Sequence, residues 1–323
     1  MRFLTRRLGF YLLTAWAAVT LNFLIPRMMP GDPVDLLVAR LKGNVDPAAI
    51  DAMKKAFGIS DADLWTQYLD YLGNLFHGEL GRSITFFPTE VSTVIADSLP
   101  WTIGLVGVAT LISYLVGTSL GVVMAWKRGT WLDGVLPAAT FLHAVPYFWV
   151  ALVLVFVFGS TLQWFPGSRA YGLEVTPGLD GEFLASMAYH ATLPAITIVL
   201  ASMADRILGM RNVMVTTLGE DYVVMAEAKG LTSRRVMWAY AARNAILPNI
   251  TSFALSLGFV VGGSVLTEIV FSYPGIGSML LKGVENEDFP LMQGIFLVIS
   301  LAVLVANLLA DLAYVILDPR TRQ

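Results

Sequence analysis

Residues 98–126 read SLPWTIGLVGVATLISYLVGTSLGVVMAW, an apolar stretch without a single Asp, Glu, Lys or Arg. A helix needs about 20 mainly apolar residues to cross the hydrocarbon core of a bilayer. Because lipid offers no hydrogen-bond partner to a polypeptide backbone, a run of this length is expected to be helical. The stretch therefore predicts a membrane-spanning helix, and it decides the class of fold.

Further stretches of the chain share this length and this freedom from charge. Together they give six predicted spans: Leu8–Pro26, Ser98–Trp126, Gly134–Ser168, Phe183–Ala204, Asn244–Thr267 and Phe289–Ala310. The third is long enough to include a re-entrant or interfacial turn, and Pro137 and Pro146 could kink it. The alternating pattern of a membrane β-barrel is absent. We therefore expect an all-α integral membrane protein with six transmembrane helices.

The composition excludes an ordinary soluble protein. Hydrophobic residues make up 56% of the 323-residue chain and charged residues 14%, whereas soluble domains carry about 25% charged residues. The absence of Cys excludes disulfides and thiolate metal sites. The net charge of −3 gives no indication of nucleic-acid binding. Membrane lipid is an expected partner, and nucleic acid is not.

Lys and Arg predict the orientation, because short cytoplasmic connections are enriched in both. Basic residues precede the first span, follow the second, recur between the fourth and fifth, and end the chain. The opposite connections are poor in positive charge, apart from the long segment 27–97, for which the rule is weak. We expect both termini in the cytoplasm. The first span is expected to be retained, since it is too long for a signal peptide and lacks a cleavage site.

Four regions are expected along the chain: the N-terminal end and first span (1–30), an extracytoplasmic cap (31–97), a core of five spans (98–317) and a cytoplasmic tail (318–323). The cap is too long for a simple linker. Helix-like stretches occur at Pro47–Phe57, with Asp46 as a candidate N-cap, and at Leu64–Phe76. We predict a small folded cap domain; the alternative is an amphipathic helix on the membrane surface.

The cytoplasmic segment 205–246 predicts a helix–turn–helix. Tyr222, Met225, Ala226 and Lys229 have helical spacing. The next residue, Gly230, can adopt the left-handed conformation that closes a helix, so that Leu231 folds back onto Met225 or Ala226. Thr232 or Ser233 then offers an N-cap hydroxyl to a second helix, which runs through Val236 and Tyr240 to Pro248. The alternative is an ordinary connector between spans four and five.

A few polar residues lie in or near the spans. His143 and Tyr147 are candidate pore-lining residues of the third span, and for His143 the alternative is a structural hydrogen bond to a neighbouring helix. Glu268 and Asp311 lie near span ends, where exposure to water costs little, so we interpret them as structural or interfacial. Glycines that favour close helix packing lie at Gly117, Gly121, Gly258, Gly262 and Gly263.

The sequence lacks several motifs that are typical of nucleotide-binding and catalytic proteins. The dipeptide Gly-Lys occurs nowhere, so the chain has no P-loop and ATP chemistry must reside on another chain. No His-Glu-x-x-His or similar metal motif is visible, and we read Pro274-Gly275 as a tight turn rather than part of a nucleotide site. We expect no catalytic residue, metal or cofactor on this chain.

The run from Glu220 to Leu231, EDYVVMAEAKGL, followed by RNAILP at 243–248, resembles the cytoplasmic "EAA" loop of bacterial ABC importer permeases. The pattern is similar to that of the dipeptide/oligopeptide/nickel permease family. Matching motifs are PGDP at 30–33, GELGRS at 78–83, Glu268 with FSYPGIG at 271–277, and DPR at 318–320. They occur in order along the whole chain. One departure is Glu227, which stands at a position expected to be variable.

The resemblance implies the type I ABC importer permease fold in a bacterial cytoplasmic membrane. It implies a second homologous permease, two ATP-binding subunits that carry ATP and Mg²⁺, and an extracytoplasmic substrate-binding protein. The long first loop resembles that of the first of the two paired permeases. The implied residues of the ATPase-coupling loop are Glu220, Tyr222, Ala226, Glu227, Ala228, Lys229, Gly230, Leu231, Arg243 and Pro248.

The function expected from this resemblance is inward transport of di- or oligopeptides by alternating access, driven by ATP hydrolysis on the partners. Oligosaccharide or nickel is the alternative cargo of the same class. A secondary transporter would require internal repeats and paired intramembrane charges, neither of which is apparent. An intramembrane enzyme would require a nucleophile or a metal cluster within a span, and none is apparent.

Overall fold

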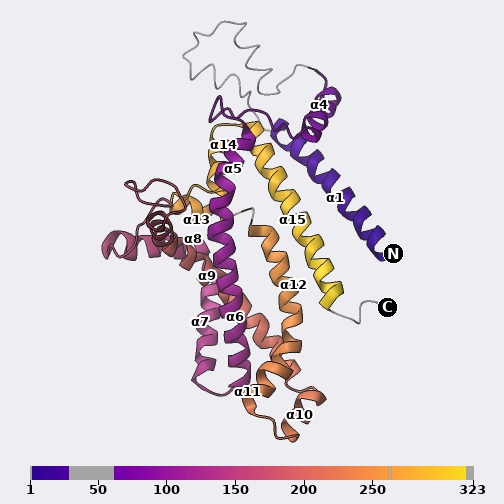
Figure 1. The fold of residues 1–323 in the computed structure, drawn as a ribbon, viewed down its shortest axis with the longest axis vertical. Coiled ribbons are helices and arrows are strands. Elements are labelled where there is room, and N and C mark those ends of the chain that lie inside the picture. Colours follow the sequence, from indigo (N-terminus) through magenta and orange to yellow (C-terminus); the bar gives the residue numbers. More distant parts are fainter. Residues whose placement is uncertain (1, 29–61, 261, 263, 318–323) are drawn as a thin grey trace. The chain divides into compact units, whose positions relative to one another are not determined.

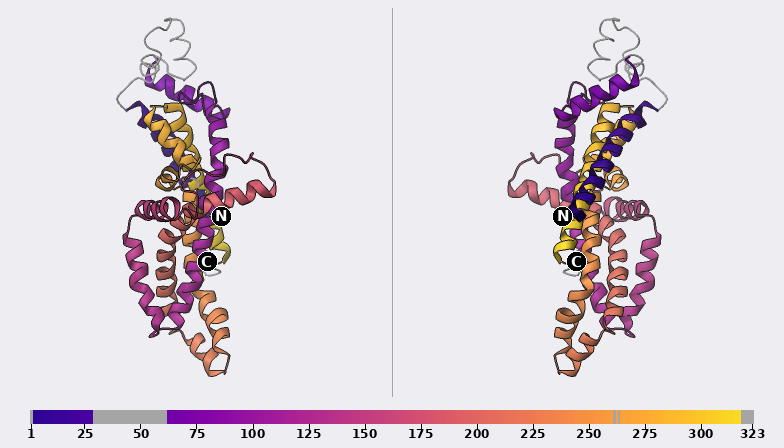
Figure 2. Two further views of the ribbon diagram at one scale, coloured as in Figure 1. Left: turned by 90° about the vertical axis from the view of Figure 1, so that its left-hand side faces the viewer. Right: turned by 90° about the vertical axis from the view of Figure 1, so that its right-hand side faces the viewer.

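The computed structural model describes residues 2–28, 62–260, 262 and 264–317, and this part of the chain is built from helices (Figures 1 and 2). The chain divides into two compact units. The first contains Met1–Thr102 and Pro274–Val305, and the second contains Ile103–Tyr273 and Ala306–Gln323. The predicted helix at Pro47–Phe57 and the motifs at 30–33 and 318–320 lie outside the described residues.

The first unit contains the helices at the two ends of the chain. They are α1 (Arg2–Arg27), α4 (Leu64–Phe76), α5 (Val91–Thr102), α14 (Ile276–Glu285) and the start of α15 (Phe289–Leu317). The second unit contains α6 (Val108–Trp126), α7 (Val135–Ala144), α8 (Tyr147–Leu154), α9 (Gly181–Thr217), α10 (Asp221–Ala228), α11 (Ser233–Arg235), α12 (Arg243–Val260) and α13 (Val265–Val270).

Three π-helical stretches and one 3₁₀ turn complete the second unit. The π-helical stretches are η1 (Ile103–Gly107), η3 (Val155–Thr161) and η4 (Val236–Ala242), and the 3₁₀ turn is η2 (Trp131–Gly134). The sequence pattern did not predict the π-helical stretches. Each is a local widening of a longer helical run, and such stretches are often found at functional sites.

Among the described residues, four helices are long and apolar enough to cross a membrane: Gly9–Arg27, Val91–Trp126, Gly181–Thr217 and Phe289–Leu309. A fifth span is present if the pair Val135–Leu142 and Tyr147–Thr161 counts as one, although the two helices are bent by 98°. Pro146 explains this break, because the residue before a proline favours an extended conformation and Val145 adopts it. The predicted span Asn244–Thr267 is not one continuous helix, since α12 ends at Val260 and α13 begins at Val265.

Helix α9 continues past residue 205, where the predicted cytoplasmic segment begins. The helix is capped by Asp180, whose carboxylate accepts a hydrogen bond of 2.7 Å from the backbone N–H of Phe183, and it continues to Thr217. Charged residues such as Arg206 and Arg211 end the apolar run, but arginine is a good helix former. Loss of hydropathy therefore marks the end of the apolar segment and not the end of the helix.

In the first unit, Asp288 fastens the segment before α5 to the start of α15. Its buried carboxylate accepts hydrogen bonds from the Ser83 hydroxyl, from the backbone N–H of Thr85 at 2.8 Å and from that of Leu291 at 3.1 Å. Beneath it lies a cluster of buried apolar side chains: Val91, Val94, Ile95, Ile276, Leu291 and Ile295. The last residue of the GELGRS motif at 78–83, Ser83, thus donates a hydrogen bond to the buried Asp288 carboxylate.

In the second unit, α6 and α9 pack closely along their lengths. A Cβ atom added at Gly117 would lie 2.7 Å from the Cβ of Arg206, and one added at Gly121 would lie 2.7 Å from the carbonyl oxygen of Ile207. Neither distance leaves room for a side chain. The packing role predicted for these two glycines is confirmed, because the absence of a side chain is what lets the two backbones approach.

Candidate functional site

The candidate site is the α10–η4 hairpin, defined as residues Asp221–Ala242, which comprises α10, the turn at Lys229–Thr232, α11 and η4. Helix α10 follows the end of α9 after a short turn at Gly219 and Glu220, and it begins at Asp221. The helix predicted from the spacing of Tyr222, Met225, Ala226 and Lys229 is confirmed.

The turn at Gly230 closes α10 in the way that the sequence predicts. Gly230 has φ +71°. Its N–H donates to the Glu227 carbonyl at 2.9 Å, and the Leu231 N–H donates to the Ala226 carbonyl at 3.4 Å. These two bonds form a Schellman motif, which satisfies carbonyls at the helix end. A Cβ at Gly230 would meet no atom within 4 Å, so the backbone conformation and not crowding is what requires glycine here.

The second half of the hairpin differs in two details from the prediction. Thr232 occupies the N-cap position with φ −62° and ψ 140°, but its hydroxyl makes no capping hydrogen bond. Its carbonyl accepts instead from the N–H groups of Arg235 and Val236, at 2.8 and 3.0 Å. Pro248 does not end the second helix, because η4 leads directly into α12 and α12 passes through Pro248 to Val260. Prolines are tolerated within membrane helices when neighbouring groups satisfy the freed carbonyl.

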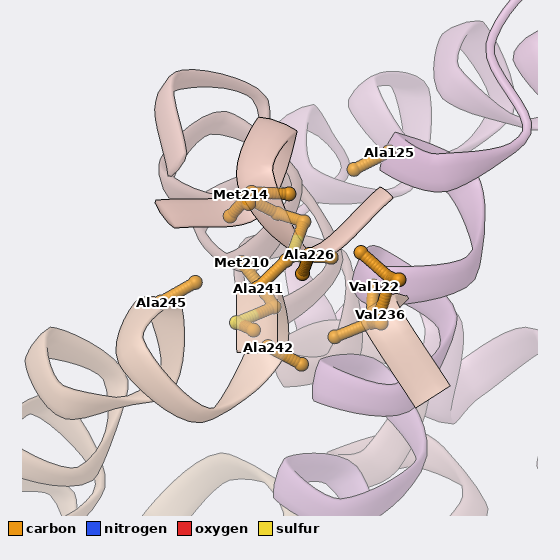
Figure 3. Close-up of a cluster of buried hydrophobic side chains, with 10 residues drawn as sticks. Val122, Ala125, Met210, Met214, Ala226, Val236, Ala241, Ala242 and Ala245 are labelled. Carbon is orange, nitrogen blue, oxygen red and sulfur yellow. The ribbon is translucent and has the colours of Figure 1, made fainter. Parts of the chain in front are cut away.

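A cluster of buried apolar side chains seats the hairpin on the ends of α6 and α9 (Figure 3). The seating cluster consists of Val122, Ala125, Met210, Met214, Val223, Ala226, Val236, Ala241, Ala242 and Ala245. Leu231 packs against its edge, as its predicted return onto Ala226 requires. Because interiors of this kind are close-packed, the cluster fixes α10 firmly against α6 and α9.

Some residues of the predicted coupling loop are buried in the seating cluster or against it, and the others are exposed. Ala226 faces inward and is buried, and Leu231 is partly buried. The exposed members are Glu220, Tyr222, Glu227, Ala228, Lys229, Gly230, Arg243 and Pro248. Buried positions can only hold the hairpin in place, so any partner of this site must be met by the exposed members.

The exposed side of the hairpin carries apolar surface as well as charge. Met225 is 57% exposed, and Val224 and Trp238 are also exposed. Trp238 lines an open hollow of about 500 Å³ together with Thr232, Arg234 and Arg235. The sequence analysis assigned no role to Trp238. Its position between Arg235 and Arg243 is a signal that could have identified it as a candidate contact residue. A surface that mixes aromatic, Met and Arg side chains is typical of protein–protein contacts.

The motif that begins at Glu268 is built differently from the prediction. Glu268 has an exposed fraction of 0%, which agrees with the structural and not the interfacial alternative of the prediction. The chain turns at Ser272, which has φ +48°, and the Tyr273 N–H then donates to the Glu268 carbonyl at 2.7 Å. The turn therefore lies at Ser272 and not at Pro274-Gly275, since Gly275 forms the N-cap of α14. Phe271 anchors this turn against Ala151 and Leu193.

Of the two pore-lining candidates, Tyr147 is the one whose side chain the structure describes. Tyr147 begins α8, directly after Pro146, and is exposed. The side chain of His143 lies outside the described residues. Within the part of the chain that the structure describes, no group of three His, Asp or Glu side chains could hold a metal ion.

Apolar helices of membrane-spanning length, with a partly exposed hairpin seated on two of them, define the class of integral membrane proteins. Residues 117–323, more than half of the chain, match the model of the family described as the binding-protein-dependent transport system inner membrane component. The chain belongs to this family, which forms the membrane component of ABC importers.

Curated relatives match the chain over nearly its whole length. The di/tripeptide transport system permease protein DppB of Pseudomonas aeruginosa is 35% identical and covers 100% of this chain and 99% of its own. The oligopeptide transport system permease protein AppB of Bacillus subtilis is 33% identical, with 93% and 92% covered. The dipeptide transport system permease protein DppB of Escherichia coli is 32% identical, with 100% and 99% covered. The family resemblance inferred from the motifs is confirmed.

Proposed function

We propose that this chain is one of two paired permeases that form the pore of an ABC importer for di- or oligopeptides. The end-to-end similarity to permeases named for peptide transport carries the proposal. Oligosaccharide or nickel is the alternative cargo of the same class of importer. The cargo is selected largely by the extracytoplasmic substrate-binding protein, which is the subunit whose ligand most directly tests the assignment.

The proposed partners are a second homologous permease, two ATP-binding subunits and the substrate-binding protein. ATP and Mg²⁺ belong to the ATP-binding subunits, because this sequence has no P-loop. The exposed side of the α10–η4 hairpin is the proposed contact with an ATP-binding subunit. Its seating cluster joins the hairpin to α6 and α9, which supports a role in transmitting movement into the membrane.

The proposed mechanism is alternating access between two arrangements whose balance ATP shifts. When the ATP-binding subunits close, the hairpins of the two permeases move together. Each hairpin carries the ends of α6 and α9 with it, and the pore opens to the extracytoplasmic side. Hydrolysis reverses the movement and releases the peptide inward.

The function is tested by reconstituting the four kinds of subunit into lipid vesicles and measuring uptake of labelled dipeptides. We expect uptake that requires both ATP and the substrate-binding protein. We also expect the purified chain alone to show no ATP turnover. Uptake without ATP-binding subunits would contradict the proposal and favour a secondary transporter, and uptake of nickel or an oligosaccharide alone would change the cargo but not the class.

We propose six spans, with both termini in the cytoplasm and the 31–97 region on the extracytoplasmic side. The hairpin residue Thr232 and the α4 residue Asp70 then lie on opposite sides of the membrane. The sequence has no native Cys, so single cysteines at these two exposed positions report accessibility without background. We expect a membrane-impermeant maleimide to label Asp70→Cys from the extracytoplasmic side and Thr232→Cys only after the membrane is opened. Labelling of both from one side of intact cells would refute this topology.

A further inference from the structure

Helix α4 has one polar side and one exposed apolar stripe. Trp65 and Leu69, four residues apart, lie on the same side, and Phe76 returns to it after three turns of about 3.6 residues. These side chains are 66%, 50% and 88% exposed. Exposed polar residues occupy the opposite side at Asp70 and Asn74. Such a division of a short helix is the pattern of an interfacial amphipathic helix.

A third side of α4 packs against the C-terminal end of α1, within the same compact unit (Figure 1). The Tyr68 hydroxyl shares a hydrogen bond of 2.7 Å with the Thr20 hydroxyl, and the Tyr68 ring lies 5.1 Å from the Phe23 ring, centroid to centroid. The Arg27 Nε donates to the Gln67 Oε1 at 3.0 Å. Three successive turns of α1 thus hold α4 in one place.

These contacts fix the height of α4 along a membrane-spanning helix. The apolar span of α1 runs from Gly9 to Arg27, and the residues that meet α4 lie in its last eight positions, from Thr20 to Arg27. At about 1.5 Å per residue, that stretch covers about 10 Å, which places α4 at the boundary between hydrocarbon and headgroups. At this height Leu21 and Ile25 of α1, and Met28 directly after the helix, are exposed and apolar. They are the surface that α1 offers to lipid.

We propose that α4 is an interfacial membrane anchor, whose stripe of Trp65, Leu69 and Phe76 inserts into the lipid leaflet at the C-terminal end of α1. Contacts with Thr20, Phe23 and Arg27 hold α4 beside the end of a membrane-spanning helix, which is why lipid and not a protein partner is the occupant of this stripe. Tryptophan is enriched at this depth of the bilayer because its ring is amphipathic. The opposite side, with Asp70 and Asn74, faces water. The helix therefore fixes the start of the segment that leads to α5. That segment is also held by the hydrogen bonds that Ser83 and Thr85 donate to Asp288.

The test measures the depth of two matched positions in the assembled importer, held in lipid nanodiscs. Single cysteines are introduced as Leu69→Cys and Asn74→Cys and labelled with the environment-sensitive fluorophore NBD. Lipids that carry a nitroxide near the headgroup quench a probe that lies in the interface, and iodide quenches a probe that lies in water. An interfacial helix of this kind buries its apolar side by about 5–10 Å.

We expect nitroxide lipids to quench the probe at residue 69 several-fold more than the probe at residue 74, and iodide to show the reverse order. Trp65→Cys provides a second reading of the same stripe if the Leu69 variant assembles poorly. Equal quenching of both positions by iodide would overturn the proposal. Protection of residue 69 that appears only when the substrate-binding protein is added would also overturn it, and would assign the stripe to that protein instead. Neither result depends on which cargo the importer carries.

Discussion

Replacement of Gly121 by alanine is expected to separate α6 from α9 and to reduce strongly the amount of folded protein in the membrane. The added Cβ would lie 2.7 Å from both the Ile207 carbonyl oxygen and the Met210 Cβ. The first of these is backbone and cannot rotate away, so one helix must shift. Overpacking of this kind costs about 1–3 kcal/mol, and a valine is expected to cost more than an alanine.

The damage at Gly121 is expected to reach beyond the helix pair. The next residue, Val122, and its neighbour across the contact, Met210, belong to the seating cluster of the α10–η4 hairpin. A shift of α6 against α9 therefore loosens the packing of the hairpin against these two helices. We expect the protein that remains in the membrane to show less cargo-stimulated ATP hydrolysis, by its partners, per assembled complex.

Gly104 offers a matched control for Gly121. It lies in the same long apolar helix, but a Cβ there would meet no atom within 4 Å. Abundance in isolated membranes and thermal unfolding in detergent are the measurements. We expect Gly104→Ala to behave like the wild type and Gly121→Ala to lose abundance and thermal stability. Similar stability of both variants would show that close approach of α6 and α9 is not required.

Replacement of Gly230 by valine is expected to abolish most transport while leaving the membrane-spanning part intact. With φ +71°, this residue occupies the left-handed region, which a β-branched residue strongly resists. Strain at such a position costs about 1–3 kcal/mol. Relief of that strain re-aims α11 and η4 relative to α10. If most of it falls on the proposed contact with the ATP-binding subunit, binding weakens about 5- to 150-fold.

The control for Gly230 is asparagine, which tolerates the left-handed conformation and often replaces glycine at this position of a helix end. Space is no obstacle to either side chain, because nothing lies within 4 Å of the added Cβ. We expect Gly230→Asn to retain most cargo-stimulated ATP hydrolysis and uptake, and Gly230→Val to lose both at equal membrane abundance. Normal uptake by the valine variant would refute the coupling role. Equal loss in both variants would show that the backbone conformation is not the cause.

Local signals in the sequence predicted the elements that depend on nearby residues. The apolar runs placed the helices now seen as α1, α6, α9 and α15, and the spacing of Leu64–Phe76 placed α4 at the bounds that the structure gives. The sequence predicted the turn at Gly230 and the return of Leu231 onto Met225 or Ala226, because a glycine at a helix end is a local signal, and the structure shows the bond to Ala226. Motif order along the chain was enough to identify the family.

Only the tertiary structure decided which of these residues face inward. Glu268 lies near the end of an apolar run, so the sequence predicted a structural or interfacial residue and left its burial open; the structure buries it completely. Ala226 and Glu227 are neighbours in one motif, but the seating cluster hides the first and leaves the second exposed. The physical reason is the same in each case: periodicity and caps act within one or two helical turns, whereas burial is set by contacts between helices that lie far apart in the chain.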